Sequence, residues 1–163
     1  MVVTPTVLLY SPHPSAPGEP DYQGALEAAG YEVVKSATVS GCIPALDRGV
    51  QLVVLDDPPW ELARTLVATA DAAPLPMPRL WISSWSKAPS LAGKLGVDAL
   101  VLERDAAALV EVVHRTLATW QPATDEVPAP RRSFRRATTT PELHPHGHAA
   151  VDEGGPDTSD SWP

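Results

Sequence analysis

The sequence predicts an α/β fold in residues 1–120, a doubly wound sandwich built on a five-stranded parallel sheet. Five short runs of Val, Leu and Ile show little alternation with polar residues, as expected of strands covered on both faces. Helical patterns separate these runs, so strand and helix alternate along the chain. This alternation implies right-handed crossovers and helices on both faces of the sheet.

The predicted strands are apolar runs with the composition of buried parallel strands. Each is followed by a stretch with a helical pattern or by turn residues, which sets its end. In chain order the strands are TVLLY (6–10), YEVVK (31–35), QLVVL (51–55), RLWIS (79–83) and DALVL (98–102).

Three helices are predicted from apolar residues spaced three and four apart. Residues 19–30 end on Gly30, which suits a left-handed helix stop. Residues 59–73 begin with a proline, and residues 104–120 offer Asp105 as an N-terminal cap. These segments are long and periodic enough to cover the predicted sheet.

Two further helical segments have weaker patterns. In residues 39–49, Pro44 is expected to confine the helix to about two turns, because a proline removes one backbone donor. Residues 86–96 are short and interrupted by glycine. We expect both to be short crossovers between strands.

Residues 121–163 form a second segment, a tail rich in Pro, Thr, Asp, His and Gly with no apolar periodicity. Such a segment cannot bury enough apolar surface to offset the entropy of ordering, so it is predicted to be disordered. Its basic run RRSFRRATTTP contains Thr138 in a context that some Ser/Thr kinases prefer, which makes Thr138 a candidate phosphosite. The HPHGH motif is interpreted as adventitious for metal binding.

Composition argues against several classes of partner. The formal net charge is -8, and the field of such a chain repels nucleic acid and anionic lipid. Cys42 is the only cysteine, so neither an internal disulfide nor a cysteine-based zinc site is expected. The N-terminal apolar stretch is too short for a signal peptide or a membrane helix. We expect a cytoplasmic protein without cofactor or metal.

Chemistry is expected at the carboxyl ends of the strands, where sites form in open parallel sheets. Two adjacent carboxylates follow the third predicted strand, and hydroxyl, imidazole and charged side chains follow the others. These residues are Ser11, Pro12 and His13, then Asp56 and Asp57, then Ser83 and Ser84, and finally Glu103 and Arg104. One interpretation of the aspartate pair is structural, with one carboxylate capping the next helix.

Several segments resemble the receiver domain of bacterial response regulators, over roughly residues 5–119. They are GALEAAGYEVVKSAT, VQLVVLDDPP, PRLWISS and GVDALVLERDAAALVEVV, in matching order and at similar spacing. The resemblance implies a flavodoxin-like fold and a role in signal transduction. It also implies that Asp56 occupies the position of the phospho-acceptor aspartate and Ser83 the position of the Ser/Thr switch residue.

The same resemblance fails at the other functional positions. Ser11 and Pro12 stand where the family has the acidic pair that binds magnesium, and Glu103 stands where it has a lysine. Magnesium needs oxygen ligands, usually carboxylates, and phosphoryl transfer needs cations to neutralise the transferred group. We therefore interpret the domain as a degenerate pseudo-receiver. The alternative is a phospho-accepting receiver that uses Asp56 with an atypical cation, for example Arg104.

We expect such a module to act through an unidentified protein partner rather than as an enzyme, with a homodimer as a further alternative. No nucleophile, base and orienting group can be placed together from the sequence, and no phosphate-binding glycine motif occurs. Trp85, just past the fourth strand, is the candidate interface residue, since aromatic side chains dominate binding hot spots. Trp81 lies inside a strand and is expected in the core, and His13 is interpreted as an ordinary loop residue.

Overall fold

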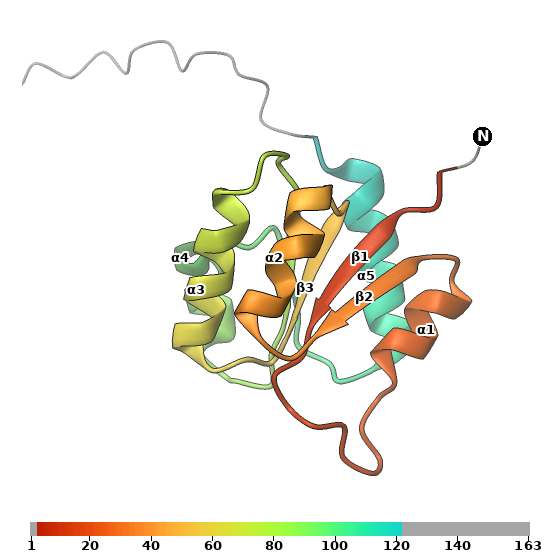
Figure 1. Cartoon of the computed structure of the whole chain (residues 1–163). Helices are drawn as coiled ribbons and strands as arrows, with labels where there is room; N and C mark the ends of the chain where they lie inside the picture. Colours follow the sequence, from red (N-terminus) through yellow and green to blue (C-terminus); the bar gives the residue numbers. More distant parts are fainter. Residues whose placement is uncertain (1–2, 122–163) are drawn as a thin grey trace, which may run out of the picture. The chain divides into compact units, whose positions relative to one another are not determined.

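Five parallel strands form one sheet in the order β2-β1-β3-β4-β5 (Figure 1). The computed structural model describes residues 3–121 of the chain. The strands are β1 (Thr6–Tyr10), β2 (Glu32–Ser36), β3 (Leu52–Asp56), β4 (Arg79–Ile82) and β5 (Ala99–Val101). The order confirms the predicted doubly wound parallel sheet and places its reversal point between β1 and β3.

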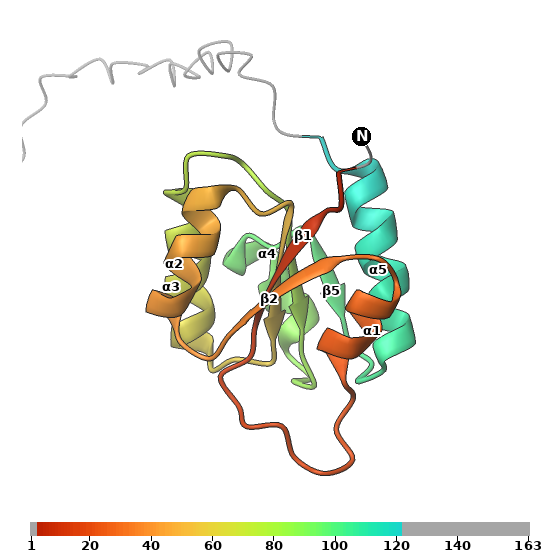
Figure 2. The same cartoon turned by 45° about the vertical axis from the view of Figure 1, so that its right-hand side comes forward.

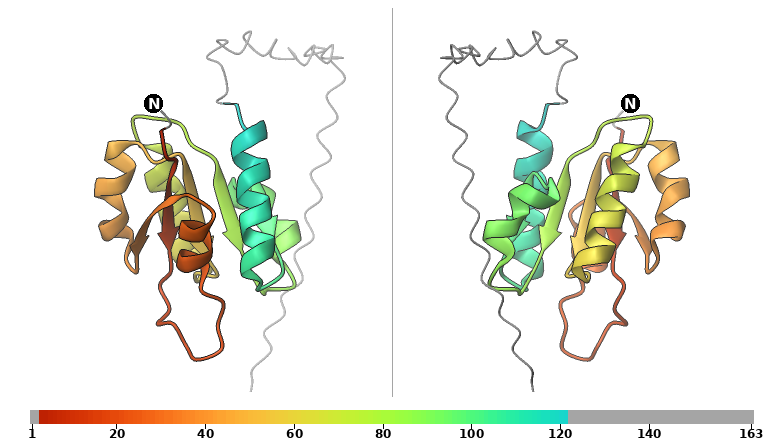
Figure 3. Two further views of the ribbon diagram at one scale, coloured as in Figure 1. Left: turned by 90° about the vertical axis from the view of Figure 1, so that its right-hand side faces the viewer. Right: turned by 90° about the vertical axis from the view of Figure 1, so that its left-hand side faces the viewer.

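A helix follows each strand, and the first four helices return the chain to the start of the next strand. The helices are α1 (Tyr22–Ala28), α2 (Val39–Arg48), α3 (Trp60–Asp71), α4 (Ala88–Leu95) and α5 (Ala106–Thr119). With the sheet seen from its side, α2 and α5 lie on opposite faces (Figure 3). The turned view in Figure 2 shows α1 and α5 next to each other, in agreement with their direct contact. The helices therefore cover both faces, as predicted.

Each strand supplies side chains to two separate apolar cores, which explains why the strands lack polar alternation. Leu8 and Val53 belong to the core under α2, α3 and α4, whereas Val7 and Leu52 belong to the core under α1 and α5. All four are fully buried. Burying a side chain of this size contributes about 1.5–3 kcal/mol, so the two cores together provide the main stabilisation of the sheet.

Side-chain caps fix where three of the helices begin. The Asp21 carboxylate accepts a hydrogen bond from the backbone of Gly24 and starts α1 later than predicted. Thr38 caps α2, and Asp105 caps α5 as expected from the sequence. Capping residues of these types satisfy backbone donors that the first helical turn leaves free.

The helix α2 continues through Pro44, so the prediction of about two turns was too short. Pro44 is exposed, and the carbonyl that loses its partner there can be solvated. Cys42, Ala45 and Leu46 on the opposite side of the helix are buried against the sheet. This burial outweighs the loss of one backbone hydrogen bond.

The strand ends shift by one residue from the predicted positions. Asp56 is the last residue of β3 rather than the first residue after it. β5 ends at Val101, so Leu102 follows the strand directly and Glu103 comes one residue later.

None of the helices in residues 3–121 has both the length and the apolar character needed to span a membrane. Thr138, the arginine run and the histidines of HPHGH lie outside the described residues.

Candidate functional site

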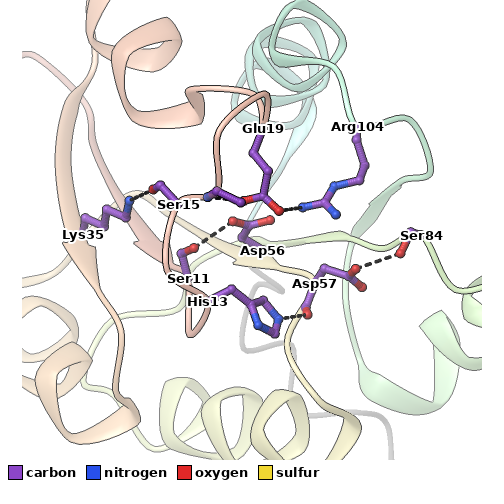
Figure 4. A network of polar contacts seen from close by, with 10 residues as sticks. Ser11, His13, Ser15, Glu19, Lys35, Asp56, Asp57, Ser84 and Arg104 are labelled. Carbon is purple, nitrogen blue, oxygen red and sulfur yellow. Dashed lines mark hydrogen bonds and ion pairs between the residues drawn. The ribbon is translucent and has the colours of Figure 1, made fainter.

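Most of the predicted site residues, among them Ser11, Asp56 and Asp57, lie together at the carboxyl edge of the sheet (Figure 4). Ser11 follows β1, Asp56 ends β3 and Ser83 follows β4. β3 pairs with β1 on one side and with β4 on the other, so these three strand ends lie beside one another. The register confirms this arrangement, since Asp56 is the pairing partner of Ile82. The strand-end rule thus predicted correctly that these side chains meet at one edge of the sheet.

The carboxylate of Asp56 points toward β1 and the loop after it. The Ser11 hydroxyl donates a hydrogen bond of 2.8 Å to Oδ2 of Asp56. The other oxygen, Oδ1, is buried and has no hydrogen-bond partner among the described residues. Ser11 thus supplies one of the few polar contacts of a carboxylate that is largely withdrawn from solvent.

The pKa of Asp56 is raised above the usual carboxyl value, chiefly because burial disfavours the ionised form. The hydrogen bond from Ser11 and the positive charge of Arg104 lower this pKa in part. The neighbouring charges of Asp57 and Glu19 raise it further. Protonation of Asp56 is therefore easier in the folded chain than in the unfolded chain.

Asp56 opens onto a small polar cavity of about 130 Å³, which we call the Asp56 cavity. Its walls come from β1, β2, β3, the loop that precedes α1 and the first turn of α1. They are formed by Leu9, Ser11, Ser15, Glu19, Pro20, Asp21, Tyr22, Gln23, Lys35 and Asp56. Arg104, from the loop after β5, lies 3.4 Å from the carboxylate of Glu19 and stands on the same side of Asp56 (Figure 4).

The donor set around Asp56 does not fit magnesium, the ion that the family resemblance implies at this place. Ser11 offers a hydroxyl that already donates to Asp56, and Pro12 has no side-chain oxygen. Among residues 3–121, no three His, Cys, Asp or Glu side chains are grouped closely enough to hold a metal ion. Magnesium requires near-octahedral oxygen ligands with compensating negative charge, and here Arg104 brings positive charge instead.

The carboxylate of Asp57 points the other way, toward the loop after β4. Ser84 donates a hydrogen bond of 2.8 Å to Oδ2 of Asp57, and Ser83 donates one of 3.2 Å to Oδ1. The backbone of Asp57 has a φ of 40°, in the left-handed region that aspartate tolerates better than most residues. This turn separates the two carboxylates, so adjacent residues serve different surroundings.

The interpretation that one aspartate caps the next helix is wrong. The helix α3 has Pro59 at its N-cap position and no side-chain hydrogen bond there. The two serines take up the oxygens of Asp57, and Asp56 faces Ser11. Both carboxylates are thus engaged at the edge of the sheet rather than at the helix end.

Ser83 is buried and connects two parts of this edge. Its hydroxyl donates to Asp57 and accepts a hydrogen bond of 3.1 Å from the backbone N–H of Trp85. Ser83 is therefore bonded to Asp57, the chain neighbour of Asp56. In the loop after β5, Glu103 is exposed, and Arg104 is the residue that approaches the carboxylates.

Sequence reasoning missed a second pocket beside Asp57, which we call the tryptophan pocket. It has a volume of about 420 Å³ and lies where the loops after β1, β3 and β4 meet. Its lining residues are His13, Asp57, Pro58, Pro59, Trp60, Trp81, Ser83 and Trp85. Trp60 begins α3 and His13 lies in the loop after β1, so no periodicity in the sequence links them.

The tryptophans of this pocket differ in exposure. Trp81 is 1% exposed and lies in the core as predicted, while Trp85 is 42% exposed. The rings of Trp60 and Trp81 are tilted by 48° with their centres 6.2 Å apart. His13 donates from Nε2 to the carbonyl oxygen of Asp57 at 2.8 Å, which ties the loop after β1 to this pocket.

Comparison with known proteins identifies the fold of this site. No protein-family model and no curated protein matches the sequence. A response regulator from Thermotoga maritima superposes with a TM-score of 0.60 at 20% identity, over 72% of this chain and 100% of that chain. A response regulator receiver protein from Sinorhizobium medicae gives a TM-score of 0.52 at 28% identity, over 71% and 96% of the two chains.

A third similar structure is described as an atypical orphan response regulator with a phosphorylation-independent regulatory mechanism. It has a TM-score of 0.55 at 21% identity and covers 71% of this chain and 97% of its own. Receiver domains thus match nearly their whole length to the part of the chain that forms the sheet and its helices. This part of the chain is a receiver-like domain with a flavodoxin-like fold.

Proposed function

We propose that this protein is a non-catalytic signalling or scaffolding module, a pseudo-receiver that acts by binding a protein partner. In this proposal the Asp56 site does not undergo magnesium-dependent phosphorylation. The receiver-like fold supports a role in signal transduction. In this proposal the partner is another protein, with a second copy of the chain in a homodimer as the alternative.

The observation that carries the proposal is the hydrogen bond between Ser11 and Asp56. A serine supplies no negative charge at the position where the resembled family places its magnesium ligands. The carboxylate is also partly withdrawn from solvent, which raises its pKa. A nucleophilic aspartate needs its ionised form and a metal to neutralise the incoming phosphoryl group, and both conditions are weakened here.

The comparisons add support of a different kind. One of the similar structures carries a description of phosphorylation-independent regulation. That description belongs to the other protein, at 21% identity. It supports the proposal as a precedent, because a protein of similar fold is described as regulating without phosphorylation.

A second candidate function is a phospho-accepting receiver in which Arg104 replaces the missing cations. The observation in its favour is that the charge of Arg104 acts on Asp56 and lowers its pKa. Arg104 is engaged with Glu19, so part of its charge is already neutralised. This candidate predicts phosphate uptake that depends on both Asp56 and Arg104.

The experiment that separates the two candidates is intact mass spectrometry after incubation with acetyl phosphate, with and without magnesium. We expect no added phosphate on the wild-type chain or on Asp56→Asn. An established receiver domain treated in parallel confirms that the reagent is active. Asp57→Asn is the matched control, because it changes the neighbouring carboxylate and leaves Asp56 in place.

A gain of one phosphate that is lost in Asp56→Asn but kept in Asp57→Asn would overturn the pseudo-receiver proposal. If that gain also disappears in Arg104→Gln, the second candidate is supported. A gain that survives Asp56→Asn would instead indicate modification at another residue and leave the proposal standing.

A further inference from the structure

The tryptophan pocket gathers three of the five tryptophans of the chain around one carboxylate. Trp60, Trp81 and Trp85 come from α3, β4 and the loop after β4, so only the fold brings them together. Asp57 contributes to the wall of the tryptophan pocket, whereas its neighbour Asp56 contributes to the wall of the other cavity. The two pockets share no lining residue and are chemically separate.

The carboxylate of Asp57 is held by neutral groups only. Ser83 and Ser84 donate hydrogen bonds to its two oxygens, and a hydroxyl carries no formal charge. In the described part of the chain the ion pairs join Arg64 to Glu61, Arg79 to Asp71, Arg104 to Glu19 and Arg115 to Glu111. None of them involves Asp57, so its negative charge lies in the wall of the pocket without a cationic partner.

An aromatic wall beside a fixed negative charge is the environment that an organic cation prefers. The faces of tryptophan rings attract cations more strongly than those of other aromatic residues. A nearby carboxylate adds a charge-assisted hydrogen bond to the same group. The pocket therefore selects for a positively charged group with apolar edges rather than for an anion or a neutral polar ligand.

Part of the pocket wall has a backbone conformation that is fixed before any ligand binds. Pro58 and Pro59 have fixed backbone φ angles and form part of the wall. The backbone of Asp57 is fixed on both sides, because its N–H donates to the carbonyl of Ile82 at 2.8 Å and its carbonyl accepts from His13. A preformed wall reduces the entropy lost on binding.

We propose that the tryptophan pocket binds an arginine side chain from a protein partner of the domain. Guanidinium is planar, weakly hydrated and able to stack on indole while bonding to a carboxylate, whereas the ammonium of lysine is strongly hydrated. Trp85 lines the pocket and is 42% exposed, so a side chain that arrives from outside can reach this wall. The net charge of -8 favours approach of a basic partner segment.

This inference rests on the proposed function, since it names the chemistry of the partner that the module would bind. The two can nevertheless fail separately. Phosphate uptake at Asp56 would overturn the pseudo-receiver and would not bear on the tryptophan pocket. Absence of arginine binding would overturn this inference and leave a non-phosphorylated module that uses another surface.

The test is an NMR titration of the full chain, followed through the indole N–H signals of the tryptophans. The probes are the capped pentapeptide Ala-Ala-Arg-Ala-Ala, the same peptide with citrulline, and the same peptide with lysine. Citrulline has nearly the shape of arginine without its charge. All titrations are compared with sodium chloride at matched ionic strength, because salt weakens exposed charge interactions.

We expect the arginine peptide to shift the signals of Trp60 and Trp85 and to leave that of Trp120 unchanged. The citrulline peptide should bind at least about tenfold more weakly than the arginine peptide. The affinity of the lysine peptide should fall between the two. Asp57→Asn should weaken arginine binding about tenfold, because it removes the charge and keeps a residue that tolerates left-handed backbone. Trp85→Ala should weaken binding similarly.

Trp120→Ala is the matched control, since it removes a tryptophan that is not part of the pocket. Circular dichroism and melting temperature establish that each variant is folded before it is titrated. Equal binding of the arginine and citrulline peptides, or no shift of the pocket signals, would overturn the inference. Binding of N-acetyl-arginine amide without binding of the peptide would also overturn it, because the site would then take a free small cation.

Discussion

The two pockets at the carboxyl edge differ although the residues at their centres are adjacent in the chain. The Asp56 cavity is small and polar, and its carboxylate is bonded to Ser11 under the charge of Arg104. The tryptophan pocket is larger and aromatic, and the carboxylate of Asp57 is held by two serines. The comparison teaches that two adjacent residues at a strand end can serve separate pockets. Asp56 faces its cavity from the last position of β3, and the turn at Asp57 directs the next side chain into the tryptophan pocket.

The largest expected effect is a difference in the free energy of unfolding between variants of the buried and the exposed tryptophan of the tryptophan pocket. Trp81→Ala should lower the free energy of unfolding by about 3–5 kcal/mol, because it removes a buried side chain and leaves a cavity. Trp85→Ala should lower it by less than about 1 kcal/mol, because this side chain is partly exposed. Urea denaturation measures both. Similar losses in the two variants would show that Trp85 contributes to the core rather than to an open pocket.

A smaller effect is expected in the pH dependence of the free energy of unfolding, which should distinguish Asp56 from Asp57. Burial raises the pKa of Asp56 in the folded chain, so the folded state holds its proton more tightly than the unfolded state. This contribution is complete below the ordinary carboxyl pKa of about 4 and is lost as pH rises through the raised pKa. Asp56→Asn, which cannot ionise, should therefore be more stable than wild type at pH 7.

The same measurement at low pH provides the check on this prediction. The advantage of Asp56→Asn should shrink as pH falls through the raised pKa of Asp56 toward the ordinary carboxyl value of about 4, because wild-type Asp56 becomes protonated over this interval. Asp57→Asn is the control, with its hydrogen-bonded carboxylate on the other side of the turn. If Asp56→Asn were destabilised at neutral pH, the ionised carboxylate would be a favourable part of the fold and the burial argument would be wrong.

The smallest expected effect concerns the charge above the Asp56 cavity. Arg104→Gln should change the free energy of unfolding by less than about 0.5 kcal/mol, because the ion pair with Glu19 is partly exposed. It should raise the pKa of Asp56, since the positive charge that lowers it is removed. Carboxyl NMR titration measures this change. An unchanged pKa would mean that Arg104 does not act on Asp56 in solution.

The sequence was sufficient for the fold because the fold depends on properties that each segment carries by itself. Continuous apolar runs are stable only when both faces of the sheet are covered, and this requirement led to the doubly wound arrangement. It was also sufficient to predict which side chains meet at the carboxyl edge, because parallel strands end at one edge. The residue-level assignments at Asp56, Ser83 and Glu103 remain interpretations of a family resemblance.

The sequence was not sufficient for the direction of the Asp57 side chain or for the tryptophan pocket. The direction depends on a single positive φ, which is supported by a backbone bond to Ile82 and by hydroxyls from another loop. The pocket requires Trp60 and Trp85 to meet across elements that no periodicity relates. Features of this kind arise from tertiary contacts, and only the three-dimensional structure reveals them.

The central place of β1 in the sheet has a consequence for how the chain acquires its structure during synthesis. β1 is synthesised before both of its partners, and it pairs with β2 on one edge and with β3 on the other. Its second edge stays open until Leu52, the partner of Val7, has been made. At a translation rate of about 5–20 residues per second this interval lasts seconds, during which an apolar strand edge is exposed to chaperones and to other nascent chains.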